Sequence, residues 1–138
     1  MGIEENKANI RRQVQECWNK GNFSAVTELI SPDFLYHTPM GDLIGHEGFI
    51  QLVTIWRTAC PDIEVTINEL VGEGDSVAVR LSWEGTFTGK FQDSEPTGNK
   101  VKMEESFYHH FKEGKDLGPI VYANHLSLFQ QMGINPTN

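Results

Sequence analysis

The spacing of apolar residues changes at Pro61, and this change restricts the fold more than any other feature of the sequence. Before Pro61, apolar residues recur at helical spacing, as at Ile10, Val14 and Trp18. After Pro61, they alternate with polar residues, as in the segment IEVTI at 63–67, which is typical of half-buried strands. Helices first and strands afterwards predict an α+β domain in which a curved sheet wraps around the helices.

Three helices are expected before Pro61. The first runs from Glu4 to Lys20 and is followed by Gly21 as a C-cap. A short second helix begins near Asn22 or Ser24 and is stopped by the Ser31-Pro32 pair. Residues 33–39 are expected to be extended, and a glycine-rich polar turn over residues 41–48 leads into a third helix that ends before Pro61.

The second half of the chain predicts a mostly antiparallel sheet. Alternating segments around 63–68 and 77–83 flank the turn sequence GEGD at 72–75, so they are expected to pair as a hairpin. A turn-rich excursion follows Trp83. Two further strands, Val101 to Lys112 and Leu117 to Phe129, are expected around the Glu113-Gly114 turn.

Length and charge restrict the class of protein. A chain of 138 residues fits a single domain over residues 1–138. The net charge is -8, and no basic cluster is longer than Arg11-Arg12, so we expect no nucleic-acid partner. With no signal-peptide pattern and no apolar run long enough to span a bilayer, we expect a soluble, cytoplasmic protein. Cys17 and Cys60 are isolated and are interpreted as buried structural thiols, not metal ligands.

Several short segments, in this order and spacing, carry a family resemblance over residues 7–133. They are YHTP at 36–39, GHEGF at 45–49, the run from PDIEV at 61 to GKF at 91, EPTGNKV at 95–101, FKEGK at 111–115 and LSLFQQMG at 126–133. Together they resemble the SnoaL-like polyketide cyclases of the NTF2-like superfamily. The resemblance implies a cone-shaped α+β barrel with three N-terminal helices in the curved sheet, a deep pocket, and a homodimer formed through the outer sheet face.

The resemblance also implies a reaction, but this sequence lacks the residue on which that reaction depends. In these cyclases, an acidic residue on the last strand acts as general acid/base in an intramolecular aldol ring closure, without metal or cofactor. Counting along the resembling segments places Asn124 at that position, and an asparagine does not titrate near neutral pH. The approach to it also departs from the family, because Gly118, Pro119 and Ile120 stand where a His-Trp pair is common. If it faces inward, Asn124 is therefore expected to orient a ligand carbonyl or a neighbouring side chain, and His125 to face away from it.

Histidines are the other candidates for proton transfer, because their unperturbed pKa lies near neutral pH. His109 and His110 are adjacent on one strand, so only one of them can face a pocket. The resemblance assigns that face to His110 and Tyr108, and it also favours His37. Phe107 and Phe111 share a face with His109, so the assignment reverses if this apolar face lines the pocket.

The candidate site therefore has a catalytic and a binding part. The catalytic candidates are His110, His37 and Asn124. The candidates for contact with the ligand come from several different elements, as expected for a pocket lining and equally for a core; they are Tyr108, His109, Trp56, Trp83, Phe34, Phe49 and Tyr122.

Three hypotheses follow from these residues. The leading one is a cofactor-independent enzyme that performs aldol cyclisation, isomerisation or dehydration on a small hydrophobic carbonyl compound. The second is a ligand-binding protein that has lost its catalytic acid, with Asn124 in its place. The third is an assembly module of the same fold, because one fold hosts several functions.

Overall fold

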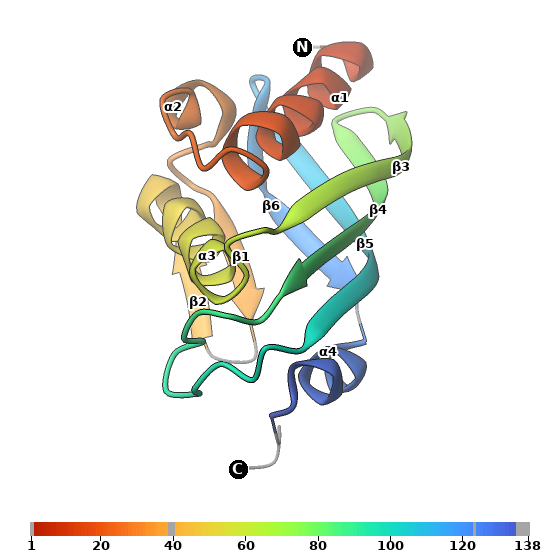
Figure 1. The fold of residues 1–138 in the computed structure, drawn as a ribbon. Helices are drawn as coiled ribbons and strands as arrows, with labels where there is room; N and C mark the ends of the chain where they lie inside the picture. The colour runs from red at the N-terminus through yellow and green to blue at the C-terminus, as the bar shows by residue number, and fades with distance from the viewer. Residues whose placement is uncertain (1, 39–40, 123, 135–138) are drawn as a thin grey trace.

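The larger sheet contains four antiparallel strands in the order β3-β4-β5-β6. They are β3 (Glu64–Glu73), β4 (Ser76–Thr86), β5 (Lys100–Lys112) and β6 (Lys115–Tyr122). The computed structural model describes residues 2–38, 41–122 and 124–134, without the side chains of residues 121 and 122. Figure 1 shows the sheet curving around the N-terminal helices, so the α+β architecture and the cone shape are confirmed, although the described strands do not close into a barrel.

The two predicted hairpins of this sheet are present. β3 and β4 pair from Glu64↔Glu84 to Glu73↔Ser76, with a bulge between Ile67 and Glu69. β5 and β6 meet at the Glu113-Gly114 turn. Burial alternates along β4, where Val77, Val79, Leu81 and Trp83 face the interior.

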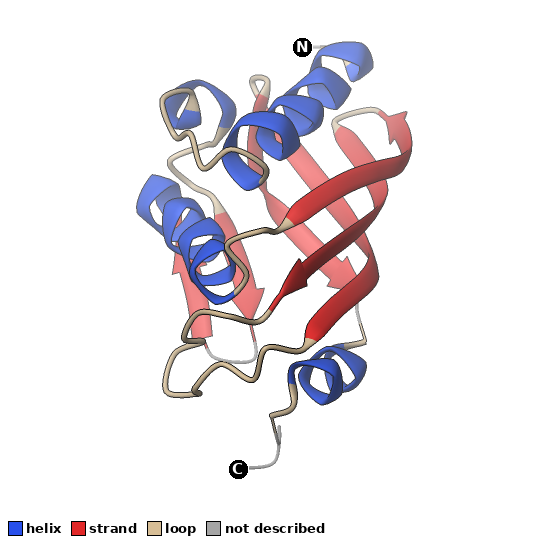
Figure 2. Ribbon diagram, viewed as in Figure 1, coloured by secondary structure: helices blue, strands red, loops and turns tan. Residues whose placement is uncertain are grey.

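The N-terminal helices cover the concave side of the sheet (Figure 2). α1 (Ile3–Arg12) continues directly into the π-helix η1 (Gln13–Trp18), and the short α2 (Val26–Leu29) ends before Ser31-Pro32 as expected. α3 (Gly45–Ala59) ends before Pro61. Apolar residues of α1 and η1 pack on the sheet, while α2 and α3 share a second cluster that includes Val26, Phe34 and Phe49.

A small second sheet was not predicted from the sequence. Its strands, β1 (Leu35–Thr38) and β2 (Gly41–Ile44), pair antiparallel from Leu35↔Ile44 to Thr38↔Gly41. The glycine-rich segment 41–48 was expected to be only a turn, but its first four residues form β2. β1 passes close to β6, because a Cβ at Gly118 would meet the Leu35 carbonyl.

The end of the chain differs most from the prediction. β6 ends at Tyr122, and helix α4 (His125–Met132) follows, so the strand expected from Leu117 to Phe129 is wrong in its second half. Leu128 and Met132 lie four residues apart and are both buried against the core, which is helical spacing. Figure 1 places α4 next to the start of β5. None of the helices in the described residues is long and apolar enough to cross a membrane.

Candidate active site

A pocket lies between the concave face of the sheet and the helices. α1, η1, α3, β1 and the first turn of α4 all contribute to its wall. Most of the lining is apolar; the polar exceptions among the described lining residues are Gln13, Tyr36, Glu105, His109, Asp116 and His125, with the indole N–H groups of Trp18, Trp56 and Trp83. Polar groups at a few points of an apolar cavity are typical of small-molecule sites.

His109 and Asp116 form a buried pair in this wall. His109 Nδ1 lies 2.8 Å from Asp116 Oδ2, and the Asp116 side chain is fully buried. A bulge brings the two together: His109 pairs with Pro119 and Phe111 with Asp116, so β6 has an extra residue at this point. Gly118 absorbs the bulge with a φ of 107° and donates its backbone N–H to Asp116 Oδ1 at 2.8 Å. Both side chains therefore face the interior.

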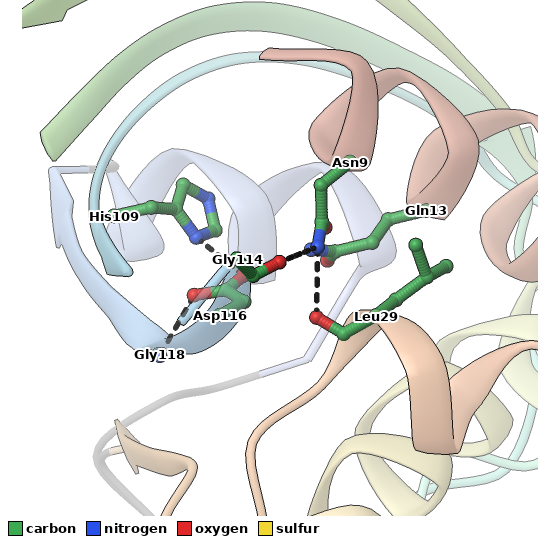
Figure 3. Close-up of polar contacts among 7 residues, drawn as sticks. All are labelled: Asn9, Gln13, Leu29, His109, Gly114, Asp116 and Gly118. Carbon is green, nitrogen blue, oxygen red and sulfur yellow. Dashed lines mark hydrogen bonds and ion pairs between the residues drawn. The ribbon is translucent and has the colours of Figure 1, made fainter. Parts of the chain in front are cut away.

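The N-terminal helix holds Asp116 from the other side (Figure 3). Gln13 Nε2 donates to Asp116 Oδ2 at 2.9 Å and to Asn9 Oδ1 at 2.8 Å. Asn9 Nδ2 in turn donates to the carbonyls of Leu29 and Gly114, which fixes the orientation of its amide. Gln13 is the first residue of the π-helix, and turns of this kind occur frequently at functional sites.

These contacts determine the charge of Asp116. Burial alone would raise the pKa of this carboxyl, but the charge and hydrogen bond of His109, with the hydrogen bonds of Gln13 and Gly118, lower it overall. Asp116 is therefore ionised and accepts hydrogen bonds only. His109 then donates from Nδ1 to the carboxylate, and in the neutral form of the ring this leaves Nε2 as a lone-pair acceptor.

A second carboxyl group lies in the pocket wall. Glu105 accepts a hydrogen bond from Trp83 Nε1 at 2.7 Å, and burial raises its pKa despite that bond. Burial, and then the charge of Glu105, raise the pKa of Tyr36 well above its usual range, so this phenol stays protonated. The pocket thus has a polar end at Glu105 in addition to the His109–Asp116 pair.

The structure places His110 and Tyr108 outside the pocket. Both are exposed on the outer sheet face, where His110 Nδ1 lies 3.0 Å from Ser76 Oγ. The apolar face with Phe107 and Phe111 is the inner one, so the reversed assignment holds and His109 is the histidine that faces the pocket. His37 is also exposed and lies 2.7 Å from Asp42 in the β1–β2 hairpin, and it is not among the lining residues.

Asn124 has a structural place that the sequence interpretation missed. It is the N-cap of α4, exposed to solvent, and its side-chain oxygen accepts the Ser127 backbone N–H at 2.9 Å. The expectation that it faces the ligand is therefore wrong. Its neighbour His125, expected to face away, is half-buried and lines the pocket.

The predicted ligand contacts divide into three groups. Trp56, Trp83, Phe34 and Phe49 line the pocket and also pack with one another or with the core, as in the Trp56–Trp83 ring pair at 5.7 Å. His109 lines it as well, whereas Tyr108 does not. The side chain of Tyr122 lies outside the described residues.

Sequence reasoning missed Asp116, Gln13 and Glu105. A signal for Asp116 was present: pairing across a two-residue Glu113-Gly114 turn puts residue 116 opposite Phe111, on the face of His109. Glu105 and His109 are four residues apart on β5, so their side chains lie on the same face of the sheet. Gln13 had no signal, because its partner lies 103 positions away in the sequence. No group of three or more potential metal ligands occurs in the part of the chain that the structure describes.

The fold and the pocket define an NTF2-like α+β protein. The sequence model of the SnoaL-like polyketide cyclases matches residues 8–132. The chain therefore belongs to the SnoaL-like polyketide cyclase family.

Solved structures agree with this family. A proposed SnoaL-like polyketide cyclase from Jannaschia sp. CCS1 is 21% identical with a TM-score of 0.85, over 97% of this chain and 95% of that one. A proposed polyketide cyclase from Acidithiobacillus ferrooxidans is 26% identical with a TM-score of 0.79, over 96% and 98% of the two chains. TsrD from Streptomyces laurentii shares the fold at 18% identity, with a TM-score of 0.86 over 98% and 99%. None of the curated proteins compared with the sequence matches it.

Proposed function

We propose that the chain is a cofactor-independent acid/base enzyme that acts on a small hydrophobic carbonyl compound by aldol cyclisation, isomerisation or dehydration. The observation that carries this proposal is the His109–Asp116 pair in an otherwise apolar pocket. The family match supports the same class of reaction. In this proposal His109 takes the acid/base role that the sequence interpretation had assigned to His110 or His37, and Asp116 orients it.

In the proposed reaction, His109 Nε2 accepts a proton from the carbon next to the ligand carbonyl. The C–H electron pair becomes an enolate, and the imidazolium that forms is stabilised by ionised Asp116 at 2.8 Å. In an aldol closure, the enolate carbon then bonds to a second carbonyl carbon, and the resulting alkoxide takes the proton back from His109. General acid/base catalysis of this kind contributes roughly 10²–10⁴-fold to a rate.

Asp116, Gln13 and Asn9 act in this scheme as positioning residues. Asp116 keeps the proton on Nδ1 so that Nε2 can act as the base. Gln13 fixes the carboxylate by donating to the oxygen that also accepts from His109. Asn9 fixes Gln13, so one helix controls the direction of the imidazole.

The second candidate is a binding protein without chemistry, favoured by the mostly apolar lining of the pocket. This hypothesis arose because Asn124 stands in place of the catalytic acid. That reason no longer applies, because Asn124 caps α4 and Asp116 supplies an ionised carboxylate. We therefore rank the binding protein second.

The test uses 2-tetralone, a bicyclic ketone with acidic protons next to its carbonyl. Exchange of these protons with D₂O is followed by NMR for the wild type, His109→Gln and His110→Gln. The two histidines are neighbours on opposite faces of β5, so His110→Gln is a matched control. We expect His109→Gln to lose about 10²-fold or more of the protein-dependent exchange rate, and His110→Gln to keep it.

Equal exchange rates in the three proteins would rule out His109 as the base. Binding of 2-tetralone without any protein-dependent exchange would favour the second candidate. Circular dichroism of each variant shows whether a lost rate reflects a lost fold.

A further inference from the structure

The geometry points to a second ligand contact in the pocket: Glu105 accepts a hydrogen bond from a hydroxyl group that the ligand carries at the end remote from its reacting carbonyl. This inference rests on the proposed function for the position of the carbonyl. It adds the substrate class, namely an elongated, uncharged, apolar carbonyl compound with a distal hydroxyl.

Glu105 and His109 lie on the same inner face of β5. They are separated by four residues, with Phe107 between them on that face, and all three line the pocket. A strand rises about 3.3 Å per residue, so the two Cα atoms are about 13 Å apart. Phe107 lies between them on this face, so we assign the Glu105 carboxyl and the His109 imidazole to different parts of the ligand.

The surroundings of Glu105 explain why it would select a hydroxyl group. Trp83 Nε1 occupies one position on Oε1, at 2.7 Å, and a carboxylate offers about four acceptor positions in all. Neighbouring lining residues such as Leu81 and Phe107 are apolar. Burial of the carboxyl among them therefore costs more free energy than the single hydrogen bond from Trp83 restores. A ligand hydroxyl would supply a further donor.

Tyr36 and the charge of the pocket narrow the ligand class further. Tyr36, from β1, lines the same pocket, and because burial raises the pKa of its phenol it stays protonated and offers a further hydrogen-bond donor. A hydroxyl both donates and accepts, and thus matches a carboxylate together with a phenol. The ionised Asp116 and the mostly apolar lining disfavour an anionic ligand.

The distance between the two ends suggests two fused rings. The side chains of Glu105 and His109 both line the pocket on the concave side of the sheet, so the span between their polar atoms is shorter than the Cα separation. The walls between them carry Trp18, Trp56 and Trp83, whose flat faces suit a ring system. A bicyclic ketone with its hydroxyl on the opposite ring has this arrangement.

The test compares 6-hydroxy-2-tetralone with 2-tetralone, which differ only in the distal hydroxyl. Binding is followed by quenching of tryptophan fluorescence, because the sequence has three tryptophans and all of them line the pocket. In the wild type, we expect the hydroxyl compound to bind about tenfold more tightly, as for one additional hydrogen bond to a carboxyl oxygen. In Glu105→Leu, this ratio should fall to about one.

Two further variants keep the result interpretable. Glu104→Leu is the matched control, because Glu104 is exposed on the outer face, where it pairs with Arg80 at 3.1 Å, and it should keep the wild-type ratio. Glu105→Gln preserves the shape and one acceptor oxygen, so it should give an intermediate ratio even if Glu105→Leu does not fold. A ratio near one in the wild type, or an unchanged ratio in both Glu105 variants, would overturn the inference.

This measurement is independent of the exchange test. It detects binding alone, so a failure here leaves the role of His109 intact. Conversely, a protein in which His109→Gln does not slow exchange can still show the Glu105-dependent preference.

Discussion

The two adjacent histidines on β5 show how much depends on one strand face. His109 and His110 have the same chemistry and neighbouring positions, yet only His109 contacts a buried carboxylate. The sequence predicts that neighbouring residues of a strand lie on opposite faces, but the family resemblance and the apolar neighbours disagreed on which face of β5 points inward. Phe107 and Phe111 were the correct guide, because apolar residues follow the inner face.

At Asp116, we predict that substitution by asparagine affects catalysis through the imidazole tautomer. With its oxygen on the Gly118 N–H, the introduced amide would present its NH₂ group to His109. His109 must then accept at Nδ1 and carry its proton on Nε2, which can no longer act as a base. We expect the 2-tetralone exchange rate to fall by about 10²–10⁴-fold, with unchanged affinity for 2-tetralone. A rate within a factor of about two of wild type would contradict this role.

At the scale of elements, the boundary between β6 and α4 decides the role of Asn124. We predict that Asn124→Ala lowers the free energy of unfolding by about 1 kcal/mol, because it removes the cap on the Ser127 N–H. Asn124→Asp keeps the cap and should neither lose stability nor gain exchange activity. Urea denaturation and the exchange assay measure the two effects, and a gain of activity in Asn124→Asp would restore the hypothesis of a lost catalytic acid.

The bulge in β6 gives a second prediction at this scale. Gly118 has a φ of 107°, and a Cβ there would meet the Leu35 carbonyl, whereas Gly98 has a φ of 77° with open space around it. Gly98→Ala should therefore cost only the backbone strain, about 1–2 kcal/mol. Gly118→Ala should cost more, and it should also weaken the His109–Asp116 pair. Urea denaturation of both variants tests this. Equal losses in the free energy of unfolding would show that the close contact between β1 and β6 adds nothing to the cost at Gly118.

Helix and strand positions were largely predictable from the sequence, and the exceptions have a common cause. The first three helices and the two hairpins follow from local periodicity and turn residues. β2 and α4 did not, because β2 is only four residues long and Leu126, Leu128 and Phe129 fit a strand pattern as well as a helix. The pocket itself depends on contacts between distant residues such as Gln13 and Asp116, which no local pattern encodes.

For the whole molecule, we predict a homodimer formed through the outer face of the sheet, as the family resemblance implies. One row across the four strands, Val71-Ala78-Tyr108-Ile120, is apolar, and Val71, Tyr108 and Ile120 are 57%, 42% and 53% exposed. Sedimentation equilibrium should give twice the monomer mass for the wild type and the monomer mass for Tyr108→Arg. A monomeric wild type would contradict the prediction.

The account as a whole depends on His109 acting as a base towards the pocket. Long-range ¹H–¹⁵N correlation spectra of the histidine rings test this directly, because the ¹⁵N shifts distinguish the charged ring and the two neutral tautomers, and the neutral form is recorded by raising the pH until it appears. We predict that His109 carries its proton on Nδ1, and that addition of 2-tetralone shifts the Nε2 signal of His109 but leaves His110 unchanged. A proton on Nε2 of His109, or a ligand response confined to His110, would contradict the account.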